Sequence, residues 1–143
     1  MATRNGSATW NGNLQDGSGH LSVGDGAWEG DYSFASRFEE GEGTNPEELI
    51  AAAHAACFSM ALSNMMAGEG HEPKSVKTTA KVHLRNVDGA PTIAKIELET
   101  EGEVPGLDED GFQRFAEQAK SDCIVSRALG GVGEMELSAR LAG

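Results

Sequence analysis

Residues 45–67 read NPEELIAAAHAACFSMALSNMMA, and the interpretation of the whole chain depends on this stretch. Asn45 can cap a helix, and Pro46 suits the first helical position because its missing N–H would have no partner there. Glu48, three residues after the cap, can complete a capping box. Alanines fill the following turns, and glycines come after them. We expect a helix over residues 46–67 that is apolar on most faces, and therefore buried within the domain or against a partner subunit.

Upstream of this helix the chain is rich in Gly, Ser and Asp, with short β-like segments between turns. We expect strands over residues 7–14, 20–23 and 32–38. In the last of these, aromatic and small residues alternate with the period of a half-buried strand. The intervening glycines match neither a dinucleotide-binding nor a phosphate-binding loop, so a nucleotide cradle is not expected.

Downstream, residues 75–85 and 92–101 alternate in polarity and read as two strands joined by a hairpin turn at 86–91. Residues 107–129 have apolar side chains at helical spacing, and residues 134–141 form a closing strand. The order is three strands, a helix, two strands, a helix and a strand. We expect an α+β fold of antiparallel sheets with two main helices, organised as a single domain over residues 1–143.

Composition excludes several classes of partner. The formal net charge is −12, which disfavours binding to nucleic acid and to anionic membranes. No apolar run approaches the roughly 20 residues of a membrane span, and the N-terminal residues lack the apolar core of a secretory signal. We therefore expect a cytoplasmic protein, a compartment in which disulfides are mostly transient, catalytic or sensing.

The chain has two cysteines, Cys57 and Cys123, one in each expected helix. One thiolate can attack an oxidant and the other can trap the product as a disulfide. The alternative is two inert, buried thiols, the more common behaviour of a cysteine in an alanine-rich helix. Their separation excludes CxxC redox motifs and zinc ribbons.

A reactive Cys57 needs a lowered pKa, because the thiolate is the nucleophile. Cys57 lies about three turns into its helix, too far from the helix N-terminus for a strong dipole effect. A positive side chain must therefore come from elsewhere, and the candidates are Arg37, Arg85, Arg127 and His54. Arg37 ends the expected strand 32–38, where a plain surface charge is the competing interpretation. His54, three residues before Cys57, lies on a neighbouring face of the helix.

Three groups of residues resemble the OsmC branch of the OsmC/Ohr family, the osmotically inducible and organic hydroperoxide resistance proteins. They are residues 36–60 (SRF, then GTNPEEL, then AAHAACFSM), residues 121–129 (SDCIVSRAL) and residues 6–12 (GSATWNG). The resemblance covers essentially the whole chain, and no motif position departs from the family. NPEELIAAAHAACF and DCIVSRAL are its most specific parts.

The resemblance implies a thiol-dependent peroxidase that reduces organic hydroperoxides to alcohols in oxidative or osmotic stress defence. By position, Cys57 is the peroxidatic cysteine and Cys123 the resolving one, while Arg37 stabilises the Cys57 thiolate and Glu47 holds Arg37. The family implies an intertwined homodimer with active sites at the subunit interface. It also implies a thiol reductant, dihydrolipoamide or a lipoylated protein, and no metal, flavin or haem.

This assignment has a geometric consequence. Glu47 and Cys57 are ten residues apart, about 15 Å along an unbroken helix, so one Arg37 cannot serve both. Either the helix breaks between them or one of the two comes from the partner subunit. Several apolar side chains can also form a wall favouring organic peroxides, with ordinary core packing as the alternative: Phe38, Phe58, Met60, Met65 and Met66.

Two other classes of function remain open from the residues. A non-enzymatic redox sensor or small-ligand-binding module would use the same thiol pair. A cysteine hydrolase would use Cys57 with His54, although no separate orienting Asn or Asp is identifiable.

Overall fold

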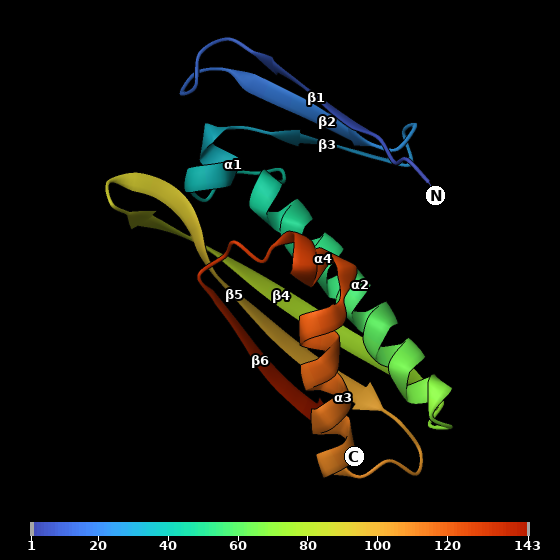
Figure 1. The fold of residues 1–143 in the computed structure, drawn as a ribbon. Helices are drawn as coiled ribbons and strands as arrows, with labels where there is room; N and C mark the ends of the chain where they lie inside the picture. The colour runs from blue at the N-terminus through green and yellow to red at the C-terminus, as the bar shows by residue number, and fades with distance from the viewer. Residues whose placement is uncertain (1, 143) are drawn as a thin grey trace. The chain divides into compact units, whose positions relative to one another are not determined.

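The structure, a computed structural model, describes residues 2–142. These residues form two compact units that divide between Leu49 and Ile50, and each unit contains one three-stranded sheet (Figure 1). The α+β class and the order of the main elements are as expected, with two short helices added. The organisation as a single domain stays a prediction.

The first unit contains an antiparallel sheet of β1 (Gly6–Asn11), β2 (Ser18–Val23) and β3 (Trp28–Tyr32). Gly19 pairs with Trp10 on one side and with Tyr32 on the other. A Cβ atom at Gly19 would lie 2.5 Å from the Tyr32 ring and 2.8 Å from the Trp10 ring. Glycine is therefore required here, because these two rings come together across it with centroids 5.5 Å apart.

The segment expected as a strand over residues 32–38 is instead helical, and this prediction was wrong. Helix α1 covers Phe34–Phe38. The Ser33 hydroxyl accepts from the Ser36 N–H at 3.0 Å, and the Ser36 hydroxyl accepts from the Ser33 N–H at 2.8 Å. This reciprocal pair satisfies the first orphan donors of a helix and outweighs the strand-like alternation.

Helix α2 (Pro46–Gly68) runs for 23 residues. Asn45 caps it as expected, since its Oδ1 accepts from the Glu48 N–H at 2.8 Å. The predicted capping box does not form in full, because the Glu48 carboxylate accepts from the Thr44 hydroxyl at 3.0 Å. By length and composition α2 would also suit a membrane span, contrary to the sequence expectation, but core helices pass the same test.

The second unit contains a sheet in the order β4 (Ser75–Val87), β5 (Ala90–Glu103) and β6 (Glu134–Leu141). Asp88 and Gly89 form the turn between β4 and β5, with φ of 52° and 82°, so the hairpin is confirmed with a tighter turn than expected. Strand β6 pairs with β5 in parallel, which requires a long crossover connection.

The crossover holds two helices where one was expected over residues 107–129. Helix α3 (Glu109–Asp122) ends at Cys123, and α4 (Ile124–Ala128) begins there. Cys123 has φ −54° and ψ 133°, outside the helical region. Its N–H still donates to the Ala119 carbonyl at 2.9 Å, while its own carbonyl accepts from Arg127 at 3.0 Å. Because Cys123 closes one helix and opens the next, the apolar period continues through the break.

The core of the second unit lies between its helices and one face of the sheet (Figure 1). Its fully buried side chains come from α2, β5 and the crossover: Phe58, Leu62, Met66, Ile96, Leu98, Phe112, Ala116, Ala119 and Cys123. Another side of α2 is exposed, including Ala52, Ala56 and Met60, the last with 75% exposure. Helix α2 is therefore buried on one face only.

The first unit has almost no core of its own. Among its described residues, Leu21 is the one buried apolar side chain. Several large apolar side chains of this unit are exposed: Leu14, Val23, Trp28 and Phe38. A three-stranded sheet needs a buried apolar face to be stable alone, and this sheet buries very little apolar surface.

Candidate functional site

The two cysteines interact within the second unit. Cys57 lies in the fourth turn of α2 and is half-buried, and Cys123 lies at the junction of α3 and α4 with 1% exposure. Both are free thiols. Cys57 packs against the buried apolar cluster that contains Cys123, and each thiol affects the pKa of the other. The structure thus brings together the two thiols that the sequence suggested as partners.

The surroundings of the two thiols affect their pKa values in opposite directions. Burial raises the pKa of Cys57, and the hydrogen bond with Cys123 raises it further. Burial also acts to raise the pKa of Cys123, but hydrogen bonds from Cys57 and from the Ser126 backbone and hydroxyl outweigh it, so that pKa is lowered. Within the second unit, Cys123 is therefore the thiol that ionises more easily. A group from outside the second unit must lower the pKa of Cys57 if Cys57 is to react as a thiolate.

A second pair of side chains connects the same two helices. His54 Nε2 and Ser126 Oγ are 2.7 Å apart, and both side chains are buried. Burial lowers the pKa of His54, so its imidazole is neutral. The ring bonds through Nε2 to Ser126 and not to Cys57, the contact that the hydrolase alternative would need. Sequence reasoning missed Ser126, although its position three residues after Cys123 was a usable signal.

Arg37 and Glu47 form an ion pair within the first unit. Arg37 Nε donates to Glu47 Oε1 at 2.8 Å, with the Glu47 side chain only 10% exposed. Glu47 Oε2 is buried and has no hydrogen-bond partner among residues 2–142. The other cationic candidates, Arg85 on β4 and Arg127 on α4, are exposed. The residues suggested for thiolate activation therefore contact each other, and a buried carboxylate holds the guanidinium.

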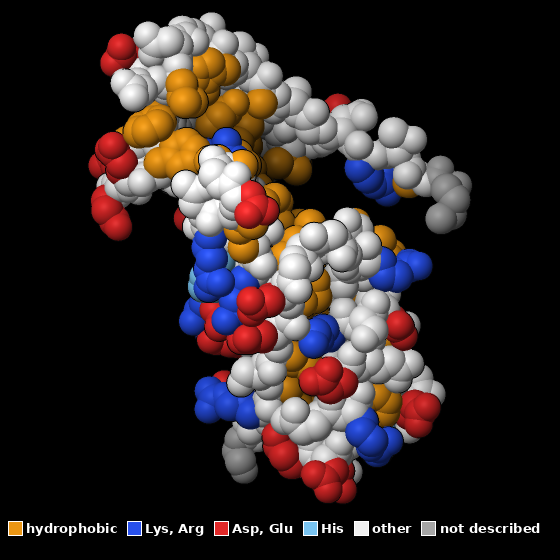
Figure 2. Space-filling model, turned by 60° about the vertical axis from the view of Figure 1, so that its left-hand side comes forward, with side chains coloured by type: hydrophobic (Ala, Val, Ile, Leu, Met, Phe, Trp, Pro, Cys, Tyr) orange, Lys and Arg blue, Asp and Glu red, His pale blue; other side chains and the backbone are white. Residues whose placement is uncertain are grey.

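An apolar hollow of about 400 Å³ lies beside Arg37 in the first unit. Figure 2 shows hydrophobic side chains gathered on this part of the molecule. The hollow is lined by Trp10, Gly12, Leu14, Tyr32, Ser33, Phe34, Arg37 and Phe38. Arg37 is its one charged lining residue, and the guanidinium carbon lies 5.3 Å from the centre of the Phe38 ring. The hollow thus combines an aromatic surface with a single cation.

The residues suggested as an apolar wall divide into different environments. Phe38 lines the hollow beside Arg37, whereas Phe58 and Met66 are core residues of the second unit. Met65 packs against that core, and Met60 is exposed. Core packing therefore accounts for Phe58, Met65 and Met66.

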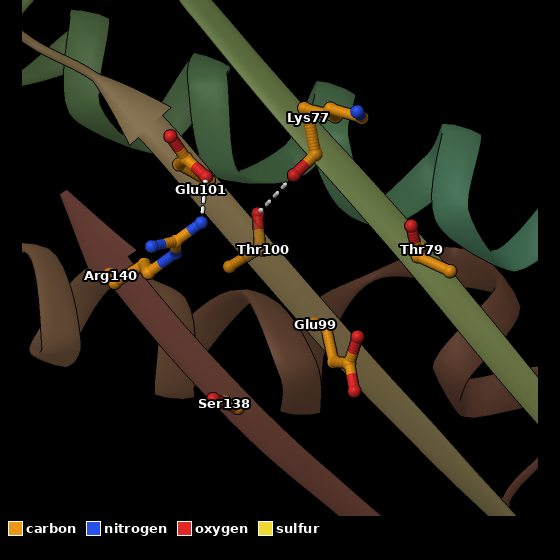
Figure 3. A pocket seen from close by; sticks show the side chains of 7 residues that line it. All are labelled: Lys77, Thr79, Glu99, Thr100, Glu101, Ser138 and Arg140. Carbon is orange, nitrogen blue, oxygen red and sulfur yellow. Dashed lines mark hydrogen bonds and ion pairs between the residues drawn. The ribbon is translucent and has the colours of Figure 1, made fainter. Parts of the chain in front are cut away.

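A polar hollow of about 360 Å³ lies on the open face of the β4–β5–β6 sheet (Figure 3). Its charged groups are largely paired within the sheet, since Arg140 bonds Glu101 at 2.5 Å and Lys81 bonds the lining residue Glu99 at 2.9 Å. It contains no thiol. Among residues 2–142 no group of three or more His, Cys, Asp or Glu side chains is placed to hold a metal ion. The thiol pair is thus the strongest candidate for chemistry.

The sequence model of the family described as OsmC-like protein matches residues 39–137, more than half of the chain. The chain belongs to the OsmC-like protein family. Within that family it is 47% identical to the peroxiredoxin OsmC of Escherichia coli strain K12 over 127 residues, 88% of this chain and 89% of that one. It is 34% identical to the organic hydroperoxide resistance protein of Xanthomonas axonopodis pv. citri over 92 residues, 64% of this chain and 63% of that one.

Solved structures of the OsmC-like fold agree with the architecture. The organic hydroperoxide resistance protein OhrB of Bacillus subtilis matches with a TM-score of 0.72 and 26% identity, covering 96% of this chain and 98% of that one. An OsmC-like protein from Mycoplasma pneumoniae matches with a TM-score of 0.78, covering 99% of each chain, and at 17% identity it supports the fold alone. The expected OsmC-like fold is therefore confirmed.

Proposed function

We propose that this OsmC-like protein is a thiol peroxidase that reduces organic hydroperoxides to alcohols. Relatives named as a peroxiredoxin and as organic hydroperoxide resistance proteins support a peroxidase-like enzyme. The observation that supports the two-cysteine form of the proposal is that half-buried Cys57 packs against the buried cluster that contains Cys123, with both thiols free. A half-buried thiol can meet a substrate, and a buried one beside it is protected until it is needed.

In the proposed cycle, the Cys57 thiolate attacks one peroxide oxygen of ROOH. The O–O bond breaks, Cys57 takes the hydroxyl oxygen and becomes a sulfenic acid, and the released alkoxide RO⁻ takes a proton from water and leaves as the alcohol ROH. Cys123 then attacks the Cys57 sulfur, which forms the disulfide and releases water. A dithiol reductant, dihydrolipoamide or a lipoylated protein, takes the oxidising equivalents and restores both thiols.

Arg37 is the proposed activator of Cys57, with Glu47 holding it. Because α2 is continuous, Glu47 and Cys57 are separated by about 15 Å along its axis. A break in the helix is therefore not the way to bring them together. We assign Arg37 and Glu47 to the Cys57 site of a partner subunit. Burial and the neighbouring Cys123 raise the pKa of Cys57. A cation from outside its own unit is therefore needed to stabilise the Cys57 thiolate.

An intertwined homodimer is the proposed setting for this site. The first unit buries one apolar side chain of its own, and α2 leaves Ala52, Ala56 and Met60 uncovered. Surfaces of this kind on two elements are typical of a chain whose core is completed by a second copy. The apolar hollow beside Arg37 would then take the carbon chain of an organic peroxide, which hydrogen peroxide lacks.

The test is a peroxide turnover assay with cumene hydroperoxide and dihydrolipoamide. Cys57→Ser is expected to abolish turnover. Cys123→Ser is expected to complete a first turnover and then gain further oxygen atoms on Cys57, seen by mass spectrometry under non-reducing conditions. Ser121→Ala, an exposed position two residues before Cys123, is the control and should match wild type.

The assay also separates the enzyme from the sensor or binding-module alternative. A sensor would oxidise once and turn over slowly even with abundant reductant. Full activity in Cys57→Ser would overturn the proposal, and so would a wild-type protein that never forms the Cys57–Cys123 disulfide.

A further inference from the structure

The helix that follows Cys123 is short and shallowly buried. Helix α4 has five residues, too few to form a stable helix alone, so its place depends on what it contacts. Ser126 is its one buried residue, with 5% exposure, whereas Ile124 is 70% exposed. Val125 is only partly buried where it packs against the core. The bonding of Ser126 is therefore important for where α4 lies.

Ser126 is bonded to a buried histidine of α2 (Figure 1). Its Oγ lies 2.7 Å from Nε2 of His54, which has 0% exposure. The other ring nitrogen, Nδ1, is buried and has no hydrogen-bond partner among residues 2–142. A buried nitrogen without a partner is unfavourable, and an apolar side chain would not carry that cost. The bond from Nε2 to Ser126 is thus the polar contact that a histidine provides at this position.

This bond joins the two segments that hold the thiols. On α2, His54 comes three residues before Cys57, so the two side chains are neighbours on the helix surface. Ser126 follows Cys123 by three residues, within the first turn of α4. The Arg127 N–H donates to the Cys123 carbonyl at 3.0 Å, so the Cys123 backbone belongs to the same hydrogen-bonded turn as Ser126. The bond therefore fixes the spacing of the segments within one turn of each thiol.

Cys123 itself stands at a joint in the chain. Its φ of −54° and ψ of 133° are outside the helical region, and its side chain does not cap α4. Its N–H donates to the Ala119 carbonyl at 2.9 Å, which holds the backbone on the α3 side. A residue at the end of an element is where a change of chain direction can be absorbed. An anchor on the α4 side is therefore needed to keep Cys123 in place.

We propose that His54 and Ser126 are positioning residues, whose hydrogen bond fastens α4 to α2 and keeps Cys123 within reach of Cys57 for disulfide formation. Cys57 already packs against the buried cluster that contains Cys123. A disulfide forms only when the two Cα atoms are about 4.4–6.8 Å apart with suitable directions. Holding the segments at such a spacing raises the effective concentration of one thiol at the other. In this role the histidine and the serine do not touch the reacting atoms.

The bond and the disulfide should favour each other. Once Cys57 and Cys123 are joined, α4 cannot move away from α2, so His54 and Ser126 stay in contact. By linkage, the bond then favours the disulfide over the dithiol by the same factor. A contact that only stabilised the fold would act equally on both forms and leave this equilibrium unchanged. The equilibrium between dithiol and disulfide therefore separates positioning from general stability.

This inference rests on the proposed function, because the disulfide is formed when Cys123 resolves oxidised Cys57, but its first test needs no peroxide. The protein is equilibrated with mixtures of oxidised and reduced glutathione, quenched with acid, alkylated and analysed by mass. The two thiols pass two electrons and two protons to one glutathione disulfide, which becomes two glutathione molecules. Ser126→Ala should lower the equilibrium constant for the disulfide by about three- to tenfold, the effect of one hydrogen bond. Ser121→Ala, the same change at an exposed position, is the control.

Conservative variants separate the hydrogen bond from the packing around it. His54→Gln has an amide that can still hydrogen-bond Ser126, whereas His54→Leu cannot. His54→Gln should therefore keep most of the wild-type equilibrium constant, and His54→Leu should lower it as Ser126→Ala does. The double variant with His54→Leu and Ser126→Ala should be no worse than either single variant, since both changes remove the same bond. Thermal unfolding of the dithiol forms shows which variants are folded.

The second measurement is a single turnover with cumene hydroperoxide, with sulfenic acid trapped by dimedone and the disulfide followed by mass. Ser126→Ala and His54→Leu should slow disulfide formation by about three- to tenfold, while Cys57 oxidation stays within about twofold of wild type. Positioning of Cys123 affects the second half of the cycle and not the attack on the peroxide.

The outcomes distinguish the two proposals. If wild type does not react with cumene hydroperoxide, the proposed function fails, and the glutathione equilibrium still decides whether the bond holds the thiols together. If folded Ser126→Ala keeps the wild-type equilibrium constant, the positioning role is overturned. If Ser126→Ala does not fold, the comparison of His54→Gln with His54→Leu decides, and equal equilibrium constants for these two would overturn the role of the bond.

Discussion

Arg37 donates from Nε to Oε1 of Glu47 at 2.8 Å, joining α1 to the first turn of α2. The Glu47 side chain is 10% exposed and the Arg37 side chain 40%, so the cation is paired through Nε while its side chain remains partly accessible. A planar donor group fixed in this way can orient a thiolate and a peroxide together. The roles proposed for Arg37 and Glu47 depend on this pair.

Arg37→Lys should therefore lower kcat/KM for cumene hydroperoxide by about 10- to 100-fold, because the charge is kept but the fixed fork of donors is lost. The rate of Cys57 oxidation measured by stopped flow checks this. Arg85→Lys, an exposed arginine on β4, is the matched control and should change the rate by less than about twofold. Equal rates for the two variants would remove Arg37 from the site.

The same pair should show coupled effects on stability. Arg37→Ala leaves the Glu47 carboxylate buried without its partner and should cost about 1–3 kcal/mol in the free energy of unfolding. Adding Glu47→Gln removes the buried charge and should recover part of that loss. Urea unfolding of wild type, both single variants and the double variant measures the coupling. Strict additivity would mean that the ion pair does not contribute in solution.

Helix α1 places Arg37, and its cap can be tested alone. Ser33→Ala removes the hydroxyl that accepts from the Ser36 N–H, a loss that should cost about 1 kcal/mol of stability. If α1 positions Arg37, peroxidase activity should fall as well, and Ser33→Asp should retain more of both than Ser33→Ala does. A Ser33→Ala protein with an unchanged urea midpoint would show that the cap is dispensable.

Gly102 on β5 marks a close contact in the core of the second unit. A Cβ atom there would lie 2.5 Å from the ring of Phe112 on α3. Gly102→Ala should therefore destabilise the protein by about 1–3 kcal/mol through overpacking. Gly131→Ala is the control, because a Cβ at Gly131 would have no atom within 4 Å. Thermal unfolding should separate the two variants clearly, and similar midpoints would contradict the packing described here.

Two histidines should give opposite pH dependence of stability. Hydrogen bonds from Asp31 and Glu29 raise the pKa of His20 above its ordinary value of 6.5. Its contribution to stability is therefore fully present below about pH 6.5 and is lost as pH rises through the folded-state pKa. Burial lowers the pKa of His54, so the unfolded chain binds that proton more readily and stability falls as pH drops below about 6.5.

Urea midpoints at about pH 5.5 and about pH 8 check both signs. His20→Gln should lower stability, relative to wild type, more at the lower pH. His54→Gln should lower it less at the lower pH than at the higher one, because the acid-sensitive group is gone. Each variant serves as the control for the other, and the same sign in both would contradict one of the two environments.

Local sequence signals predicted much of the fold. Asn45 and Pro46 marked the start of α2, and Asp88 with Gly89 lies within the turn expected between β4 and β5. Each of these depends on groups within a few residues, such as a cap oxygen or a backbone with positive φ. The signal failed over residues 32–38, where a strand-like alternation competed with the serine cap of a helix.

The sequence by itself determined that this is an α+β chain with one thiol in each of two helical segments, because helix caps, periodicity and motif spacing are local properties. The tertiary structure decided the rest. Only folding joins Ser126 to His54 across 72 residues, gives Cys123 an extended backbone between two helices, and sets burial against hydrogen bonding at each sulfur. The reason is physical: a pKa and a hydrogen-bond partner depend on what surrounds a group in space, which no spacing along the chain specifies.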